Sequence, residues 1–122
     1  MKKVRLKYEQ PRRLFRQELE NIFLGGDGQE IGSALRSAFY SEDANWVLGW
    51  CLKFVGHREG IARKSAIQVL GNISVLGRSK VDLSVCHLVA EKLCDDPVEE
   101  VRIAAKDALE DIQHAITLKR EA

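Results

Sequence analysis

Residues 95–112 read DDPVEEVRIAAKDALEDI, from Asp95 to Ile112. Pro97 stands where the first turn of a helix tolerates a missing N–H, and the acidic pair Glu99 and Glu100 follows it in that turn. Beyond this start the apolar residues recur with helical spacing, at Val98, Val101, Ala105, Ala108, Leu109, Ile112 and Ile116. The pattern predicts an amphipathic helix that opens at Pro97 and buries one stripe.

The same pattern occurs 39 residues earlier in the chain. Within 61–73, four residues are identical at this offset, namely Arg63, Ala66, Leu70 and Ile73 against Arg102, Ala105, Leu109 and Ile112. The segment 46–55 likewise shares its apolar positions with 85–94. The offset therefore predicts two copies of one helical hairpin, at 44–77 and 80–118.

Helical spacing covers almost the whole chain, and the alternation typical of strands is nearly absent. Six helices are predicted, at about 11–24, 29–40, 44–55, 59–76, 81–94 and from Pro97 onward. The first two helices form a third hairpin, 11–41, which does not follow the 39-residue offset, as expected for a degenerate cap. We expect the central hairpin to be the most buried, because it holds both tryptophans and has neighbours on two sides.

The stretch 95–112 resembles the second half of a HEAT repeat, with Asp and Pro at the turn, then Val-Arg, small residues, Ala-Leu and Ile. The stretch 61–73 is a weaker copy with His57 and Arg58 at its turn. The resemblance implies an all-α fold, a short right-handed α-solenoid of about three antiparallel hairpins forming one domain over 1–122. It also implies that Arg63 and Arg102 pair with turn acids and tie neighbouring repeats together, with Asp95 or Asp96 serving Arg102.

Charge is distributed unevenly along a chain whose net charge is only +1. Residues 1–16 carry seven basic side chains and one acidic one, and the remainder carries twelve basic and seventeen acidic residues, a net of −5. The basic arm suits either a solvated terminus or contact with RNA or an acidic partner. The acidic remainder argues against nucleic acid as the main ligand.

Neither a metal site nor a cofactor site is predicted. Cys86 and Cys94 coincide with Val47 and Val55 at the 39-residue offset, so they are interpreted as core residues, and no zinc-ligand spacing occurs. The run Gly25–Gly28 lacks the flanking strand and Lys of a phosphate loop and is interpreted as a helix break. No run of 18 apolar residues predicts a membrane span, no signal peptide is recognised, and the odd cysteine count fits a cytoplasmic protein.

A candidate partner-binding row lies on the predicted outer faces of the last helix and the fourth helix. Its members are Glu99, Ile103, Lys106, Asp107, Glu110 and His114, with Lys64, Ile67 and Gln68. Apolar residues repeated beside acids favour a docking surface, whereas a wide buried stripe would explain Ile67 and Val75 equally well.

The function predicted is non-catalytic protein binding, since no Ser/His/Asp, Cys/His or paired-carboxylate arrangement stands out. Small HEAT-like proteins of this kind are similar to bacterial immunity proteins of contact-dependent growth inhibition systems. That resemblance implies a monomer that binds a basic toxin domain, such as a nuclease, in a 1:1 complex and covers its active site. The alternatives are a HEAT-like lyase, a nucleic-acid-associated protein of the glycosylase type, or a general assembly adaptor.

Overall fold

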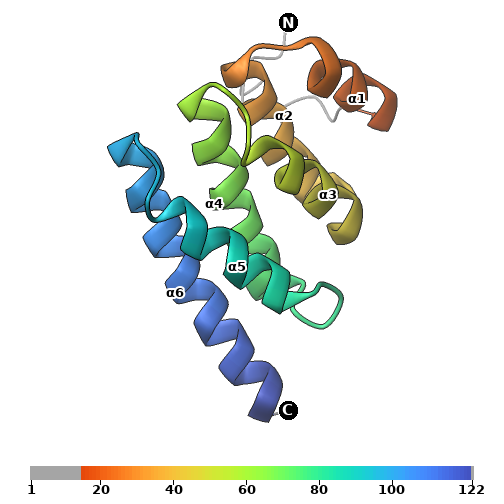
Figure 1. The fold of residues 1–122 in the computed structure, drawn as a ribbon. Coiled ribbons are helices and arrows are strands. Elements are labelled where there is room, and N and C mark those ends of the chain that lie inside the picture. Colours follow the sequence, from red (N-terminus) through yellow and green to blue (C-terminus); the bar gives the residue numbers. More distant parts are fainter. Residues whose placement is uncertain (1–14, 122) are drawn as a thin grey trace, which may run out of the picture.

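The computed structural model describes residues 15–121, and over that range the chain forms six helices and no strands. The helices are α1 (Arg16–Gly25), α2 (Gly28–Ser41), α3 (Ala44–Phe54), α4 (Gly60–Leu76), α5 (Leu83–Leu93) and α6 (Glu99–Glu121), as Figure 1 shows. Every predicted helix end that falls in this range lies within two residues of the observed one. The predicted start at Pro11 lies outside the described residues.

Helix α6 begins at Glu99 and not, as the sequence suggested, at Pro97. The carboxylate of Asp96 accepts a hydrogen bond from the backbone N–H of Val98 at 2.9 Å, and the carbonyl of Val98 accepts from Arg102 N–H at 3.1 Å. Pro97 therefore belongs to the turn that leads into the helix. The acidic first turn, Glu99 and Glu100, is as predicted.

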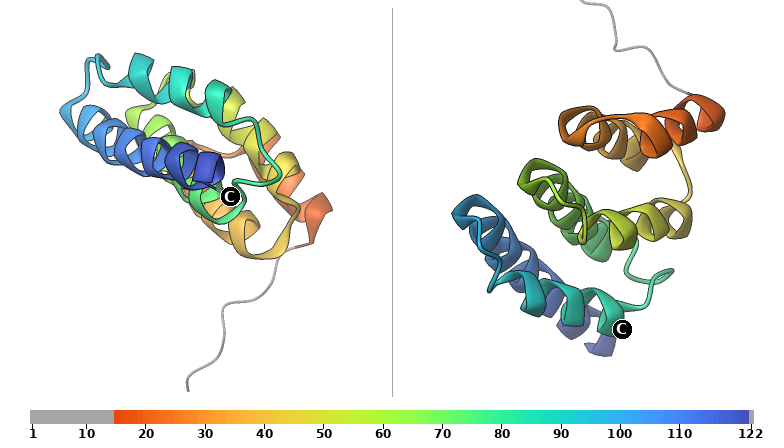
Figure 2. Two further views of the ribbon diagram at one scale, coloured as in Figure 1. Left: turned by 90° about the horizontal axis from the view of Figure 1, so that it is seen from below. Right: turned by 45° about the horizontal axis from the view of Figure 1, so that its top comes forward.

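The helices are arranged as three successive pairs, α1/α2, α3/α4 and α5/α6, which follow one another through the molecule (Figure 2). Helix α4 packs against α2 on one flank and against α6 on the other. Consecutive helices within each pair also pack together, and α3 and α5 bridge to α2 and α4 respectively. Helix α4 is therefore the central helix, which packs against α2, α3, α5 and α6.

Burial confirms that the central pair lies deepest. Helix α4 buries residues on several sides, including Ile67, Gly71 and Ser74. The residues 39 positions later, Lys106, Glu110 and Gln113, are all exposed on α6. The difference follows from the neighbours, because α6 has a packing partner on only one flank of its pair.

Small residues allow the close approach of α4 to both neighbours. At Gly32 of α2, a Cβ atom would overlap the hydroxyl of Ser65 on α4. At Gly71 of α4, it would lie 3.1 Å from the Cβ of Ala108 on α6. Any larger side chain at these two points would push the helices apart.

The 39-residue offset also relates the helix caps. Asp43 accepts hydrogen bonds from the backbone N–H groups of Asn45 and Trp46 at the start of α3. Asp82 accepts from Ser84 and Val85 at the start of α5 in the same way. These carboxylates satisfy N–H groups that have no partner inside the helix.

Two arginines at this offset make the same pair of hydrogen bonds to the preceding turn. The guanidinium of Arg63 donates to the carbonyls of His57 and Arg58 at 2.8 and 3.1 Å. The guanidinium of Arg102 donates to the carbonyls of Asp96 and Pro97, again at 2.8 and 3.1 Å. Each arginine thus holds the turn of its own pair closed.

The expectation that Arg63 pairs with a turn acid and ties neighbouring pairs together is confirmed, with Asp96 as the acid. The expectation that the carboxylate of Asp95 or Asp96 serves Arg102 is wrong, because Arg102 bonds the backbone carbonyls of its turn. Asp96 receives two hydrogen bonds from Arg63, from Nε at 2.8 Å and from Nη2 at 3.0 Å. Both side chains are largely buried, with 13% and 8% of their surface exposed. The Arg63 hydrogen bonds lower the pKa of Asp96 below its usual value. This bidentate pair ties α4 to the turn before α6.

Both tryptophans lie in an aromatic cluster between the first two pairs. Phe23 of α1 contacts Trp50 and Phe54 of α3, with ring centroids 4.7 and 5.6 Å apart. The guanidinium of Arg16 lies 4.4 Å from the centre of the Trp46 ring and also donates to Glu42 at 3.0 Å. Arg16, the last residue of the basic arm, is therefore packed against α3, whereas residues 1–14 lie outside the described part.

None of the helices in the described part of the chain is long and apolar enough to cross a membrane.

Candidate functional site

A shallow groove runs along the surface formed by α2, α4 and α6, which we call the α2/α4/α6 face. Its volume is about 290 Å³. The lining comes from all three helices: Arg36, Gln68, Val69, Asn72, Ala104, Asp107, Ala108 and Asp111. The groove lies beside the close helix contacts, because Arg36 is near Gly32, and Ala108 and Asp111 are near Gly71.

The groove is polarised across its width. On α2, the guanidinium of Arg36 donates to the hydroxyl of Ser65 at 3.1 Å, which fixes its position on one side. On α6, the carboxylates of Asp107 and Asp111 stand one turn apart on the other side. Amide side chains of Gln68 and Asn72 lie between them on α4. The arrangement offers hydrogen-bond acceptors and negative charge on the α6 side, which suits contact with hydrogen-bond donors and cations.

The predicted row of partner-binding residues is only partly brought together. Gln68 and Asp107 both line the groove. Lys64 lies on the same side of α4, where its ammonium pairs with Glu100 at 3.8 Å. The remaining predicted members are exposed on α6 outside the groove lining: Glu99, Ile103, Lys106, Glu110 and His114. Among these, Ile103 exposes 54% of its surface.

The prediction that Ile67 belongs to a surface row is wrong, because its side chain is completely buried. It lies in the core that α4 shares with its neighbours, and Val75 is half-buried. The alternative explanation from the sequence, a wide buried stripe on α4, is therefore correct for Ile67.

The sequence interpretation missed Arg36, Asn72 and Asp111. A helical wheel shows which residues share a face of one helix, but it does not show which neighbour that face meets. The available signal was the small residues Gly32 and Gly71, which mark the lines along which the helices approach each other. Polar residues beside those lines are the ones that border the groove.

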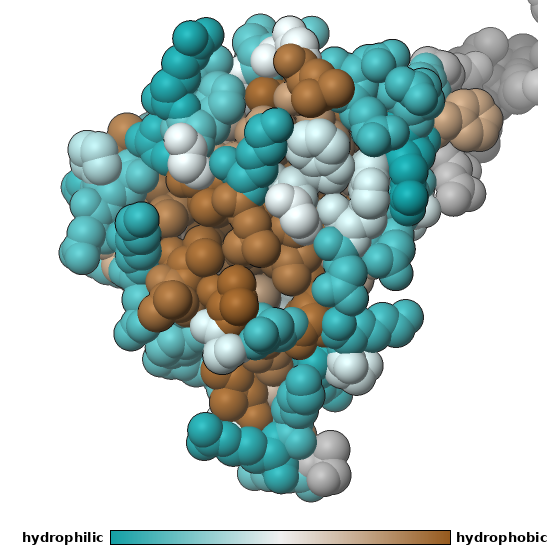
Figure 3. Space-filling view, turned by 45° about the vertical axis from the view of Figure 1, so that its right-hand side comes forward, coloured by the Kyte–Doolittle hydropathy of each residue, from teal (hydrophilic) through white to brown (hydrophobic). Residues whose placement is uncertain are grey.

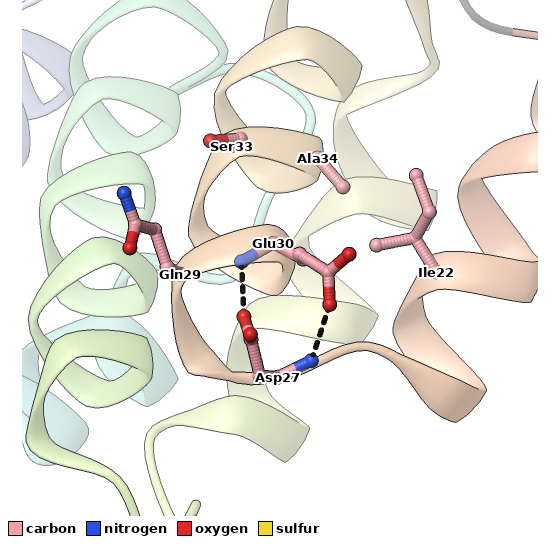
Figure 4. Close-up of a pocket in the computed structure, with 6 residues that line it drawn as sticks. All are labelled: Ile22, Asp27, Gln29, Glu30, Ser33 and Ala34. Atoms are coloured by element: carbon pink, nitrogen blue, oxygen red, sulfur yellow. Dashed lines mark hydrogen bonds between the residues drawn. The ribbon is translucent and has the colours of Figure 1, made fainter.

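A second depression lies at the other end of the molecule, between α1 and α2 (Figure 4). The acidic residues in its lining, Asp27 and Glu30, hydrogen-bond to each other's backbone. The carboxylate of Asp27 accepts from the N–H of Glu30, and the carboxylate of Glu30 accepts from the N–H of Asp27, each at 2.9 Å. This reciprocal capping box starts α2. The helix break predicted at Gly25–Gly28 thus acts as a cap, and these carboxylates have a structural role.

The cysteines behave as core residues, as predicted for Cys86. Cys51 and Cys86 are fully buried, and Cys94 is partly buried. Burial raises the pKa of both buried thiols, which keeps them protonated and unreactive. Within residues 15–121, no group of three or more His, Cys, Asp or Glu side chains is placed to hold a metal ion.

An apolar area covers part of the opposite surface, where α3 and α5 lie (Figure 3). On α5, Val85 and Leu88 expose 37% and 68% of their surfaces. Leu52, Val55 and Val89 are partly buried against the core. Hydrophilic residues surround this area in the same view.

No family model matches the sequence, and no curated protein matches it. The fold, however, is similar to that of a solved structure, a chain from the crystal structure of a CDI complex from Cupriavidus taiwanensis LMG 19424. The TM-score is 0.71 at 24% sequence identity, and the match covers 89% of this chain and 96% of that chain. The two chains therefore share an all-helical fold over nearly their whole lengths.

Proposed function

We propose that this chain is a non-catalytic immunity protein that binds and neutralises a cognate bacterial toxin domain. The observation that carries the proposal is the likeness in fold to a chain of a CDI complex, over 89% of this chain and 96% of that chain. CDI denotes contact-dependent growth inhibition, in which an immunity protein protects the cell from a toxin.

The proposed architecture is a short HEAT-like α-solenoid of three hairpins, 11–41, 44–77 and 80–118, in one domain. It is supported by the 39-residue offset between the caps Asp43 and Asp82 and between the arginines Arg63 and Arg102. In such an array each pair contacts its sequence neighbours and presents one extended surface. The α2/α4/α6 face is the surface proposed here for the partner.

The proposed partner is a basic domain, for which a nuclease is the natural candidate, bound as a 1:1 complex in the cytoplasm. Helix α6 exposes five carboxylates, at Glu99, Glu100, Asp107, Glu110 and Asp111, and the same stretch has two cations, the exposed Lys106 and the half-buried Arg102. A surface of this sign attracts a cationic active-site cleft and accelerates its association. Covering the cleft would then block the toxin's substrate.

The function is tested by co-expressing this chain with the C-terminal toxin domain encoded beside its gene. We expect cells to be protected and the two proteins to purify together. A toxin domain that still kills the cells and does not co-purify would contradict the proposal.

The role of the acidic surface is tested by reversing the charges at Glu99, Asp107 and Glu110 to Lys. We expect the association rate at low salt to fall by about tenfold or more, because steering depends on the field of these charges. The matched control reverses three exposed acids away from these positions, Glu91 and Asp95 before α6 and Glu121 at its C-terminal end. Equal association rates for the two triple variants, measured by stopped flow, would reject steering by Glu99, Asp107 and Glu110.

A further inference from the structure

Two large apolar side chains at the C-terminal ends of α2 and α4 are almost fully exposed. Tyr40 exposes 85% of its surface and Leu76 exposes 75%, the highest values among the large apolar residues of the described range. Both line one pocket of about 390 Å³, whose inner wall includes Phe39, Val47 and Ile73. Exposing such groups to water is unfavourable, and a pocket that gathers them has the composition of a binding hot spot.

This pocket continues the α2/α4/α6 groove. Tyr40 lies one helical turn after Arg36 on α2, and Leu76 lies one turn after Asn72 on α4. Arg36 and Asn72 both line the groove. The surface therefore changes along its length from an apolar pocket at one end to a polar channel flanked by acids.

Charge around the combined surface favours a cationic ligand. Glu42 and Asp43 border the pocket, and Asp107 and Asp111 border the groove. Against these four carboxylates stand three cations: Arg36 and Lys80 in the lining, and Arg16, which pairs with Glu42. Asp43 and Glu42 are held in place, since Asp43 caps α3 and Glu42 accepts a hydrogen bond from Arg16 at 3.0 Å. The field is thus fixed before any ligand arrives.

We propose that Tyr40 and Leu76 form an anchor pocket for an apolar or aromatic side chain of the partner protein, and that Lys or Arg residues flanking that side chain lie along the groove toward Asp107 and Asp111. This inference rests on the proposed function, because it takes the toxin domain as the partner. The apolar anchor supplies the energy that slows dissociation, and the acidic flank fixes the direction of the bound segment. The partner's segment is therefore amphipathic, with its apolar and basic residues on one side.

The test compares two double variants of the full-length protein. Tyr40→Ala with Leu76→Ala removes the anchor, and Leu24→Ala with Leu88→Ala removes two apolar residues of 71% and 68% exposure from other surfaces. Both variants should unfold at the wild-type urea concentration, because all four side chains lie outside the core. With the toxin domain encoded beside the gene as probe, we expect the anchor variant to bind at least about 30-fold more weakly, mainly through faster dissociation, and the control to bind within about threefold of wild type.

The outcomes separate this inference from the proposed function. Wild-type protein that protects cells, together with an anchor variant that binds as tightly as the control, would overturn the anchor pocket alone. Wild-type protein that binds no toxin domain would overturn both. Sedimentation of the free protein gives a further check: a wild-type dimer that becomes a monomer in the anchor variant would show that a second copy occupies the pocket, which also overturns the inference.

Discussion

Helices α4 and α6 show how one sequence pattern serves two different environments. At the 39-residue offset both bury Ala66 and Ala105, and both bury Ile73 and Ile112. On the other flank the correspondence fails, since Ile67, Gly71 and Ser74 are buried whereas Lys106, Glu110 and Gln113 are exposed. The shared residues are buried in both pairs, and the burial of the differing ones depends on whether another pair follows. The number of neighbouring helix pairs, more than the repeated sequence pattern, decides whether this flank of the helix carries apolar or polar residues.

The largest effect is expected from truncating a side chain that is buried on α4 but has an exposed counterpart on α6. Ile67→Ala should lower the free energy of unfolding by about 2–5 kcal/mol, because it leaves a cavity between packed helices. Lys106→Ala, at the matched position on α6, should change it by less than about 0.5 kcal/mol. Urea denaturation followed by circular dichroism measures both. Similar losses for the two variants would mean that α4 and α6 have equivalent surroundings.

A smaller loss is expected at the junction between the second and third pairs. Asp96→Ala should destabilise by about 1.5–3 kcal/mol, since it removes two charge-assisted hydrogen bonds and leaves the Arg63 guanidinium without its carboxylate. The neighbouring Asp95→Ala, an exposed residue, is the matched control and should be close to neutral. Equal unfolding midpoints for the two variants would show that the Arg63–Asp96 pair does not stabilise the protein.

The same junction should respond to acid in a defined direction. The hydrogen bonds from Arg63 lower the pKa of Asp96, so its stabilising effect is complete above the usual aspartate pKa of about 3.9 and is lost as the pH falls through the lower folded value. The difference in free energy of unfolding between wild type and Asp96→Asn should therefore be constant from pH 7 to about pH 5 and shrink below about pH 4. A difference that persists unchanged in acid would contradict the assignment.

The smallest structural effects are expected at the two equivalent caps. Asp43→Ala and Asp82→Ala each remove two hydrogen bonds to backbone N–H groups at a helix start. We expect both losses to be smaller than that of Asp96→Ala, and the loss at Asp43 to spread to more of the chain, because α3 belongs to the central pair. Amide hydrogen exchange distinguishes them: faster exchange in the first turn of α5, with none in α3, is expected only for Asp82→Ala.

Local features of the fold were predictable from the sequence because local chemistry determines them. The break at Gly25–Gly28, the acidic start of α6 and the cap at Asp82 depend on residues within one turn. The pairing of Asp96 was not predictable with the same accuracy. Its partner, Arg63, is 33 positions away, and the choice between Arg63 and Arg102 depends on how the turns stack.

The candidate site was less accessible to sequence reasoning than the fold. The exposed face of α6 followed from its wheel, so Asp107 was found. Arg36 and Asn72 were not, because they border the groove only once α2 and α4 are packed together. Tyr40 and Leu76 were assigned no role. From the sequence alone, an apolar residue at a helix end is expected to be buried, and only the packing of the neighbouring helices shows that these two are exposed.

The guanidinium of Arg63 also has a consequence for cooperativity. It holds carbonyls of the turn before α4 and, through Asp96, the turn before α6. The two turns therefore gain their hydrogen bonds together, and neither can open without leaving a charged group unsatisfied. A stack whose pairs met only through apolar contacts would fray from its free end, one pair at a time. This junction instead makes α5 and α6 unfold together with α4, so the acidic helix stays ordered for as long as the core does.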